Sequence, residues 1–167
     1  NTREYTLDNS TSSKLVCSFR GHVIVHDVTC ILTFYKRPHC IHEQLRAIQE
    51  QTVKPKEIII YVNYAEGVDF PDDIQGVTVV RSSQNFGVWA RFAVAMMAKT
   101  EYVCVFDDDT IPGKKWLENC CQTMEKVNGL LGTIGVVFQN SMDRYLIDKR
   151  WGWDGPCDDI KQVDIVG

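Results

Sequence analysis

Eight consecutive residues decide the fold: Tyr102-Val103-Cys104-Val105-Phe106-Asp107-Asp108-Asp109. The first five are apolar, β-branched or aromatic, which is the composition of a buried strand. Three carboxylates follow directly, and Pro112 then favours the start of a helix. The acids are therefore predicted to lie at the carboxyl end of a strand, where open α/β sheets bind their ligands.

Short apolar runs alternate with amphipathic helical stretches along most of the chain. Further strands are predicted at residues 28–34, 57–62, 77–81 and 134–138. The run at 57–62 is almost entirely apolar, as in a strand that is covered on both faces of a parallel sheet. This alternation predicts an α/β fold, with a Rossmann-like, mostly parallel sheet flanked by helices.

Three helices are expected between these strands. They are predicted to begin at Pro38, to span residues 88–98, and to begin at Pro112. Helical spacing assigns their buried faces to Ile41, Leu45 and Ile48, to Val88, Phe92, Ala95 and Met96, and to Leu117, Cys120, Cys121 and Met124. Trp89 is expected in the core, residues 63–76 are expected to be mostly loop, and the part after residue 138 is expected to be less regular.

Length and composition bound the class of protein. A chain of 167 residues is about one domain, and its 44% hydrophobic and 24% charged residues are typical of globular proteins. The net charge of −4 argues against a nucleic-acid partner, because surfaces that bind nucleic acid concentrate Lys and Arg. No run in this chain approaches the roughly 20 apolar residues of a membrane span.

Seven cysteines are present, an odd number with no Cys-x-x-Cys pair. We therefore expect most of them to be buried as small hydrophobic residues rather than to form disulfides or bind zinc. This pattern fits a reducing compartment, so a cytoplasmic location is expected.

The acidic run has two interpretations. Asp109 or Thr110 could cap the helix expected near Pro112, since Asp and Thr are common capping residues. Alternatively, the run binds a cation, because three adjacent carboxylates repel one another unless a positive charge offsets the repulsion. Mg²⁺ and Mn²⁺ suit such oxygen ligands and take one or two carboxylates together with substrate phosphates. The position at a strand end favours the metal site.

Four segments, taken in order, resemble a known family. They are Thr33-Phe34-Tyr35-Lys36-Arg37-Pro38, Ile58-Ile59-Ile60-Tyr61-Val62-Asn63, Asn85-Phe86-Gly87-Val88-Trp89-Ala90-Arg91 and Val105-Phe106-Asp107-Asp108-Asp109-Thr110-Ile111-Pro112. Together they resemble a family-2-type glycosyltransferase of the GT-A fold, and the acidic run resembles that family's DXD motif. Such enzymes use a nucleotide-diphosphate sugar, usually with manganese or magnesium, and transfer the sugar to an acceptor hydroxyl.

The resemblance implies a role for each acid. Asp109 is implied as the main metal ligand, Asp107 as a metal ligand near the ribose of the donor, and Asp108 as a donor contact between them. A cation held there would neutralise the charge that builds on the departing diphosphate. A UDP-sugar is the favoured donor, with a GDP-sugar as the alternative, and the implied transfer goes to a glycan hydroxyl with inversion.

The same resemblance implies contacts to the nucleoside. Thr33, Tyr35 and Arg37 stand where the family holds the base and the ribose, and the ring of Tyr35 could stack on the base. Asn63 stands where relatives often have an Asp that contacts the base. The identity of the base therefore stays open.

Contacts to the diphosphate are implied further along the chain. Asn85 and Arg91 flank the start of the predicted helix 88–98, and the forked guanidinium of an Arg is suited to phosphate oxygens. The alternative for Arg91 is a surface salt bridge.

The last part of the chain offers candidates for the acceptor side. An inverting transfer needs a carboxylate that takes the proton of the acceptor hydroxyl, and the carboxylates of suitable type are Asp154, Asp158 and Asp159. Trp151 and Trp153 could form a platform for an acceptor sugar, or this region could be a covering flap.

We expect one domain over residues 1–167, with a nucleotide-sugar-binding core at 28–140 and a partial acceptor-side region at 141–167. The chain ends in a strand-like run, so a longer catalytic domain is expected. Two other functions stay open: a nucleotidyltransferase, although no Gly-rich phosphate loop follows the first strand, and a non-catalytic domain that binds a nucleotide sugar. A phosphatase of the haloacid-dehalogenase type fits less well, because Thr110 follows Asp109 directly.

Overall fold

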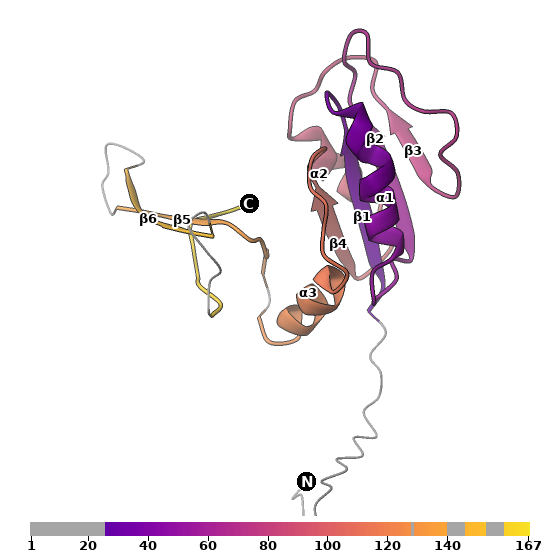
Figure 1. Ribbon diagram of the computed structural model, residues 1–167. Helices are drawn as coiled ribbons and strands as arrows, with labels where there is room; N and C mark the ends of the chain where they lie inside the picture. Colours follow the sequence, from indigo (N-terminus) through magenta and orange to yellow (C-terminus); the bar gives the residue numbers. More distant parts are fainter. Residues whose placement is uncertain (1–25, 128, 140–145, 153–158) are drawn as a thin grey trace, which may run out of the picture.

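A four-stranded sheet forms the main body of the protein, whose computed structural model describes residues 26–127, 129–139, 146–152 and 159–167. The elements, in chain order, are β1 (Val28–Phe34), η1 (Pro38–Cys40), α1 (Ile41–Gln49), β2 (Glu57–Val62), β3 (Thr78–Arg81), α2 (Ala90–Ala95), β4 (Tyr102–Phe106), α3 (Trp116–Met124), β5 (Gly135–Phe138), β6 (Ile147–Trp151) and β7 (Ile165–Val166) (Figure 1). The predicted strands at 28–34, 57–62 and 102–106 are confirmed with the same bounds.

All four strands of the main sheet run parallel, in the order β3-β2-β1-β4. Strand β1 lies at the centre and is buried along most of its length, which explains its continuous apolar sequence. In register, Leu32 lies opposite Phe106 of β4 and opposite Ile60 of β2. The predicted α/β class and the mostly parallel sheet are confirmed.

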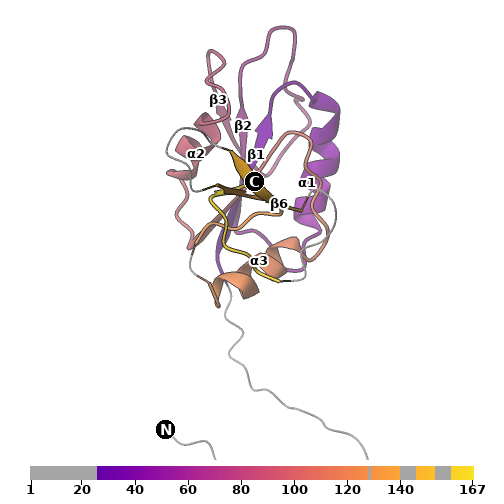
Figure 2. The ribbon, with the colours of Figure 1, turned by 90° about the vertical axis from the view of Figure 1, so that its left-hand side faces the viewer.

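The helices cover both faces of this sheet. The β1–α1–β2 and β3–α2–β4 connections cross the sheet in opposite directions, so crossovers of the same hand place α1 and α2 on opposite faces. Figure 2 shows the two helices on opposite sides of the strands. Helix α3 joins the face of α1, because Leu117 and Cys121 pack in the same cluster as the α1 residues.

Residues of β1 alternate between the two faces, as the two-residue period of a strand requires. Leu32 and Phe34 pack in the cluster beneath α1 and α3, whereas Ile31 packs in the cluster beneath α2 with Val94. The predicted buried face of α1 is confirmed, since Ile41, Leu45 and Ile48 are buried. It also includes a buried glutamine, Gln44.

Of the predicted core face of the second helix, Ala95 is partly buried and packs against the cluster beneath α2. The prediction is wrong for the other three residues, as is the prediction that Trp89 lies in the core. Helix α2 has six residues, and the one it buries is Val94. Trp89 is 77% exposed and Met96 is 87% exposed, and Val88 and Phe92 are also exposed. A helix of fewer than two turns presents a narrow stripe to the sheet, so apolar residues elsewhere on it stay outside.

The third helix begins at Trp116, later than the predicted start at Pro112. The side chain of Gln51 donates a hydrogen bond to the carbonyl of Gly113 and accepts one from the amide of Leu117. This contact satisfies backbone groups that a helix start at Pro112 would otherwise use. Of the predicted apolar stripe, Leu117 and Cys121 are buried, whereas Cys120 and Met124 are partly buried.

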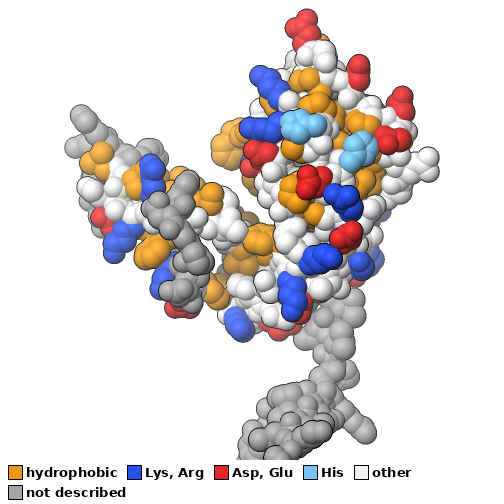
Figure 3. Space-filling model, viewed as in Figure 1, with side chains coloured by type: hydrophobic (Ala, Val, Ile, Leu, Met, Phe, Trp, Pro, Cys, Tyr) orange, Lys and Arg blue, Asp and Glu red, His pale blue; other side chains and the backbone are white. Residues whose placement is uncertain are grey.

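A second, three-stranded sheet lies apart from the main one in Figure 1. Its order is β6-β5-β7, and both pairings are antiparallel. The strand predicted at 134–138 thus pairs here as β5, and the part after it contains β6 and β7, which the prediction of a less regular tail missed. Strand β6 carries the polar sequence IDKRW, so apolar periodicity did not reveal it. Figure 3 shows this part beside the main body, whose visible face mixes acidic and basic side chains.

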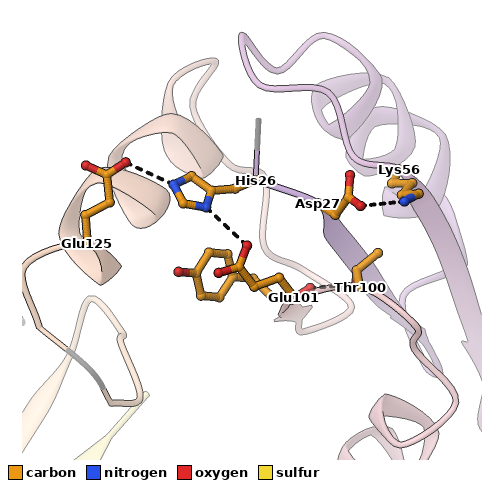
Figure 4. A network of polar contacts seen from close by, with 7 residues as sticks. His26, Asp27, Lys56, Thr100, Glu101 and Glu125 are labelled. Carbon is orange, nitrogen blue, oxygen red and sulfur yellow. Dashed lines mark hydrogen bonds and ion pairs between the residues drawn. The ribbon is translucent and has the colours of Figure 1, made fainter. Parts of the chain in front are cut away.

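A polar cluster closes the amino end of β1 (Figure 4). The buried His26 contacts Glu101 through Nδ1 at 3.4 Å and Glu125 through Nε2 at 3.0 Å. Asp27 pairs with Lys56 beside it. Because Glu101 precedes β4 and Glu125 follows α3, the cluster ties three separate segments together at this end of the sheet.

Five cysteines lie in the described residues, and all are free thiols. Cys30 and Cys121 are buried as predicted, whereas Cys40, Cys104 and Cys120 are partly buried. Cys17 and Cys157 lie outside the described residues. Within those residues, no helix has both the length and the apolar character that crossing a membrane requires.

Candidate functional site

Polar side chains line the carboxyl edge of the main sheet. Because the four strands are parallel, the segments that follow them all emerge at this edge, in the order of the strands. The direction of chain progression reverses between β1 and β4, so their two carboxyl ends flank the switch point of the sheet. Residues 35–37 and 107–109 follow these two strands and meet there.

Arg37 joins the two segments. Its Nη1 donates to Oδ1 of Asp108 at 2.6 Å and lies 3.3 Å from Oδ2 of Asp109. The backbone amide of Lys36 donates to the other oxygen of Asp108 at 3.2 Å. The hydrogen bond to Asp108, with the charges of both acids, raises the pKa of Arg37 above its ordinary value. Both carboxylate oxygens of Asp108 therefore accept hydrogen bonds from the segment that follows β1.

Asp107 forms an ion pair with Arg91, the second residue of α2, which covers the face of the sheet opposite α1. The side chain of Arg91 is 17% exposed, and burial lowers its pKa from the ordinary value. Its Nε is buried and has no hydrogen-bond partner among the described residues. The ion pair expected as an alternative for Arg91 is thus present, and it lies at the acidic run itself.

The three acids differ in how open they are. The side chain of Asp108 is 12% exposed, whereas that of Asp109 is 49% exposed and pairs with Arg37 alone among the described residues. Two guanidinium groups therefore partly balance three carboxylates, and Asp109 faces solvent. The capping interpretation is wrong, because Lys115 occupies the N-cap position of α3 and no side chain forms a capping hydrogen bond there.

A second set of side chains lies on the β2 and β3 side of the edge. Asn85 donates through Nδ2 to the hydroxyl of Tyr35 at 2.7 Å and accepts from Nδ2 of Asn63 at 2.9 Å. The oxygen of Asn63 accepts from the hydroxyl of Tyr61 and from the amide of Phe86, both at 3.1 Å. Asn63 is buried and holds the segment after β3, while Tyr35 and Asn85 lie nearer the surface.

Thr33 lies on the α2 face of β1, because it alternates with Leu32 and Phe34 of the opposite face. Its hydroxyl oxygen is buried and has no hydrogen-bond partner among the described residues. Thr33 and Arg91 therefore each have a buried polar atom without a hydrogen-bond partner among the described residues, and both residues lie on the α2 side of the sheet.

Gln44, which is fully buried in α1, was not among the residues predicted from the sequence. Its Nε2 donates to the carbonyls of Asp107 and Thr110, so it touches the backbone of the acidic run. A signal was present in the sequence. Gln44 stands at helical spacing between Ile41 and Ile48, where an apolar residue is expected.

The acceptor-side candidates are only partly described. Asp159 is exposed, accepts a hydrogen bond from the amide of Ile160 and lies 3.7 Å from Nζ of Lys161. Asp154, Asp158 and Trp153 lie outside the described residues. Trp151 ends β6, and Nζ of Lys161 lies 5.9 Å from the centre of its ring.

Solved structures that are similar to this chain include two crystal structures of TarS from S. aureus. The first is 18% identical, with a TM-score of 0.48 over 67% of this chain and 21% of the other. The second, TarS 1-349 in complex with UDP, is 16% identical, with a TM-score of 0.49 over 71% of this chain and 37% of the other. The chain thus spans well under half of either protein's length. None of the curated protein sequences matches the chain.

The match to a family model covers residues 29–164, from the second residue of β1 to the residue before β7. The family described by that model is glycosyl transferase family 2. The matched range includes every segment on which the resemblance in the sequence was based, so the predicted family is confirmed. The chain belongs to glycosyl transferase family 2.

Proposed function

We propose that this chain is the donor-binding part of a metal-dependent glycosyltransferase. It binds a nucleotide-diphosphate sugar, with a UDP-sugar favoured over a GDP-sugar, and the enzyme transfers the sugar to a glycan hydroxyl with inversion. The observation that carries the proposal is the placement of Asp107, Asp108 and Asp109 at the switch point of the sheet, between Arg37 and Arg91.

The chemistry of the acids fits a divalent cation. Among the described residues, no group of three or more His, Cys, Asp or Glu side chains is arranged to hold a metal. Mg²⁺ and Mn²⁺ need fewer protein ligands at such sites, because one or two carboxylates act together with substrate phosphates. Asp109, half exposed, and Asp107 offer these carboxylate oxygens. A cation held by them would supply Lewis-acid stabilisation of the departing diphosphate.

The two arginines give the site its positive charge. Each is already charged and already lies against an acid, so a diphosphate that enters between them meets guanidinium groups that are held in place. Arg91 also has a buried Nε without a protein partner among the described residues. A buried donor of this kind favours binding of an acceptor-rich group such as a phosphate.

The nucleoside would lie toward β2 and β3. Tyr35 offers a ring for stacking, and its hydroxyl is held by Asn85, which favours one orientation of the ring. Asn63 is buried, and its oxygen accepts hydrogen bonds from Tyr61 and Phe86. It acts on the nucleoside site indirectly, because its amide nitrogen donates to Asn85, which in turn holds the hydroxyl of Tyr35. A base contact by Asn63 stays a prediction, as does a contact by the unpartnered hydroxyl of Thr33.

The remaining parts of the proposal rest on the sequence. Asp158 and Asp159 remain candidates for the base that deprotonates the acceptor, and the acceptor itself is proposed from the family alone. A cytoplasmic location is proposed from the usage of cysteine, and the five free thiols of the described residues support it.

Calorimetric titration with UDP and with GDP, each with and without Mn²⁺, tests the donor site. The wild-type chain is expected to bind UDP more tightly when Mn²⁺ is present. Asp109→Asn should lose this gain while it keeps metal-free binding and an unchanged circular dichroism spectrum, because it removes one negative ligand at a half-exposed position.

Asp27→Asn is the matched control. Asp27 lies at the amino end of β1, opposite the site, where it pairs with Lys56, so its loss should leave the Mn²⁺ effect unchanged. An unchanged Mn²⁺ effect in Asp109→Asn would refute the metal assignment. Tighter binding of UTP than of any UDP-sugar would favour a nucleotidyltransferase, and binding without any transfer of labelled sugar would favour a non-catalytic domain.

A further inference from the structure

Two buried glutamines, Gln44 in α1 and Gln51 just after this helix, face the segment between β4 and α3. Gln44 and Gln51 are both fully buried. Burying an amide costs free energy unless its polar atoms find partners, and an aliphatic side chain would fill either place without that cost. The partners of each amide therefore indicate why a glutamine stands there.

The amide of Gln44 bridges the two ends of the acidic turn, residues 107–110. Its Nε2 lies 2.6 Å from the carbonyl oxygen of Asp107 and 2.8 Å from that of Thr110. The amide of Thr110 also donates to the carbonyl of Asp107, at 3.2 Å, which closes the turn. Both partners of the side chain are acceptors, so the nitrogen must face them and both of its protons are used.

The other end of the same amide is unused. Oε1 of Gln44 is buried and has no hydrogen-bond partner among the described residues. The buried unpaired oxygen costs free energy, whereas the two hydrogen bonds that the nitrogen donates to the turn are favourable. Without those donors, the carbonyls of Asp107 and Thr110 would lose the partners that tie the turn to α1.

Gln51 uses the same chemistry on a different segment. Its Nε2 donates to the carbonyls of Ala47 and Gly113, and its Oε1 accepts from the amide of Leu117. These contacts lie beyond the acidic turn and hold the start of α3. The two glutamines are thus a natural pair, in which one contacts the acids' backbone and the other does not.

We propose that Gln44 is the positioning residue of the acidic turn, and this rests on the proposed function of that turn as a metal and diphosphate site. By holding the carbonyls on either side of Asp108 and Asp109, it sets where the carboxylates of Asp107 and Asp109 lie. Groups that orient metal ligands in this way typically change metal affinity about 10- to 100-fold when they are removed.

The test compares three variants with the wild type. Gln44→Met keeps the length of the side chain and removes both donors. Gln44→Glu keeps the shape of the side chain and, in its protonated form, one of the two donors. Gln51→Met removes the hydrogen bonds that Gln51 donates to the carbonyls of Ala47 and Gly113. UDP is titrated into each protein at a series of Mn²⁺ concentrations, and unfolding in urea is measured in parallel.

The apparent Mn²⁺ affinity in the presence of UDP is expected to fall roughly tenfold or more in Gln44→Met and by an intermediate amount in Gln44→Glu. Metal-free binding of UDP should change little. Gln51→Met should lose stability and keep the wild-type dependence on Mn²⁺. Should Gln44→Met fail to fold, the comparison of Gln44→Glu with Gln51→Met decides the question in the same way.

Equal Mn²⁺ dependence in the wild type and the folded Gln44 variants would overturn the positioning role and leave the proposed function intact. Loss of Mn²⁺ dependence in Gln51→Met as well would also overturn it, because a general loss of stability would then account for both. If the wild type itself shows no effect of Mn²⁺ on UDP binding, the proposed function fails, and the role of Gln44 with it.

Discussion

The two faces of the main sheet differ in how much core they carry. Among the described residues, twelve buried side chains form the cluster on the α1/α3 face, whereas four form the cluster on the α2 face. The α2 side leaves large apolar residues exposed, namely Phe86, Val88, Trp89, Phe92, Met96 and Met97. An open hollow of about 570 Å³ also lies there, lined by residues that include Tyr61, Phe86 and Trp89.

The two faces therefore contribute differently to the stability of the fold and to the candidate site. The α1/α3 face carries most of the buried apolar area and holds the acidic turn from behind through Gln44. The α2 face buries little, yet it supplies Arg91 and the unpartnered hydroxyl of Thr33 to the site. Substitutions of apolar core residues on the first face should therefore change the free energy of unfolding, whereas substitution of Arg91 on the second should change binding.

The largest expected effect is on the α1/α3 face. Ile48→Ala should lower the free energy of unfolding by about 2–5 kcal/mol, because the side chain is fully buried and its loss leaves a cavity. Met96→Ala, on the α2 side, should change it by less than about 0.5 kcal/mol, because Met96 is almost fully exposed. Urea unfolding measures both values, and similar losses for the two variants would remove the contrast between the faces.

The second effect is on binding. Arg91→Ala should weaken UDP binding roughly 10- to 100-fold, as expected for the loss of charged hydrogen bonds worth about 1.5–3 kcal/mol, and should affect uridine much less. Stability should change little, because the partner Asp107 is more than half exposed and remains solvated. Arg46→Ala, an exposed residue of α1, is the control and should bind both ligands like the wild type. Equal losses for UDP and uridine would place Arg91 away from the phosphates.

The smallest effect concerns pH at the amino end of β1. The hydrogen bond to Glu125 raises the pKa of His26 above its ordinary value; burial opposes this shift, and Glu101 adds to it. A histidine whose pKa is raised by folding stabilises the protein fully below its unfolded pKa of about 6.5, and this contribution is lost as pH rises through the folded pKa.

His26→Gln should therefore lose most stability near pH 6 and least at alkaline pH, where the wild type no longer has the extra contribution. Unfolding in urea at several pH values between 6 and about 9 measures this difference. His42→Gln, the same substitution at an exposed position of α1, is measured alongside as the control. A difference between His26→Gln and the wild type that grows as pH rises would contradict the assignment.

The sequence determined the elements whose pattern is local. The strands 28–34, 57–62 and 102–106 were predicted with their observed bounds, because short continuous apolar runs of that length are typical of strands in a parallel sheet. The position of the acids at a strand end, and the family, followed from the same local patterns. Less could be predicted for α2, because Val94 and Phe92 are both apolar and only contact with the sheet decides which is buried.

Only the tertiary structure decided which polar groups meet. Gln44 contacts the carbonyl of Asp107 across 63 positions of the chain, and Arg37 contacts Asp108 across 71. Periodicity shows which residues are apolar, but a hydrogen bond between distant residues depends on strand order and helix placement, which no local pattern records. The acids were therefore visible in the sequence, whereas the groups that hold them in place became visible only when β1, α1 and β4 were packed together.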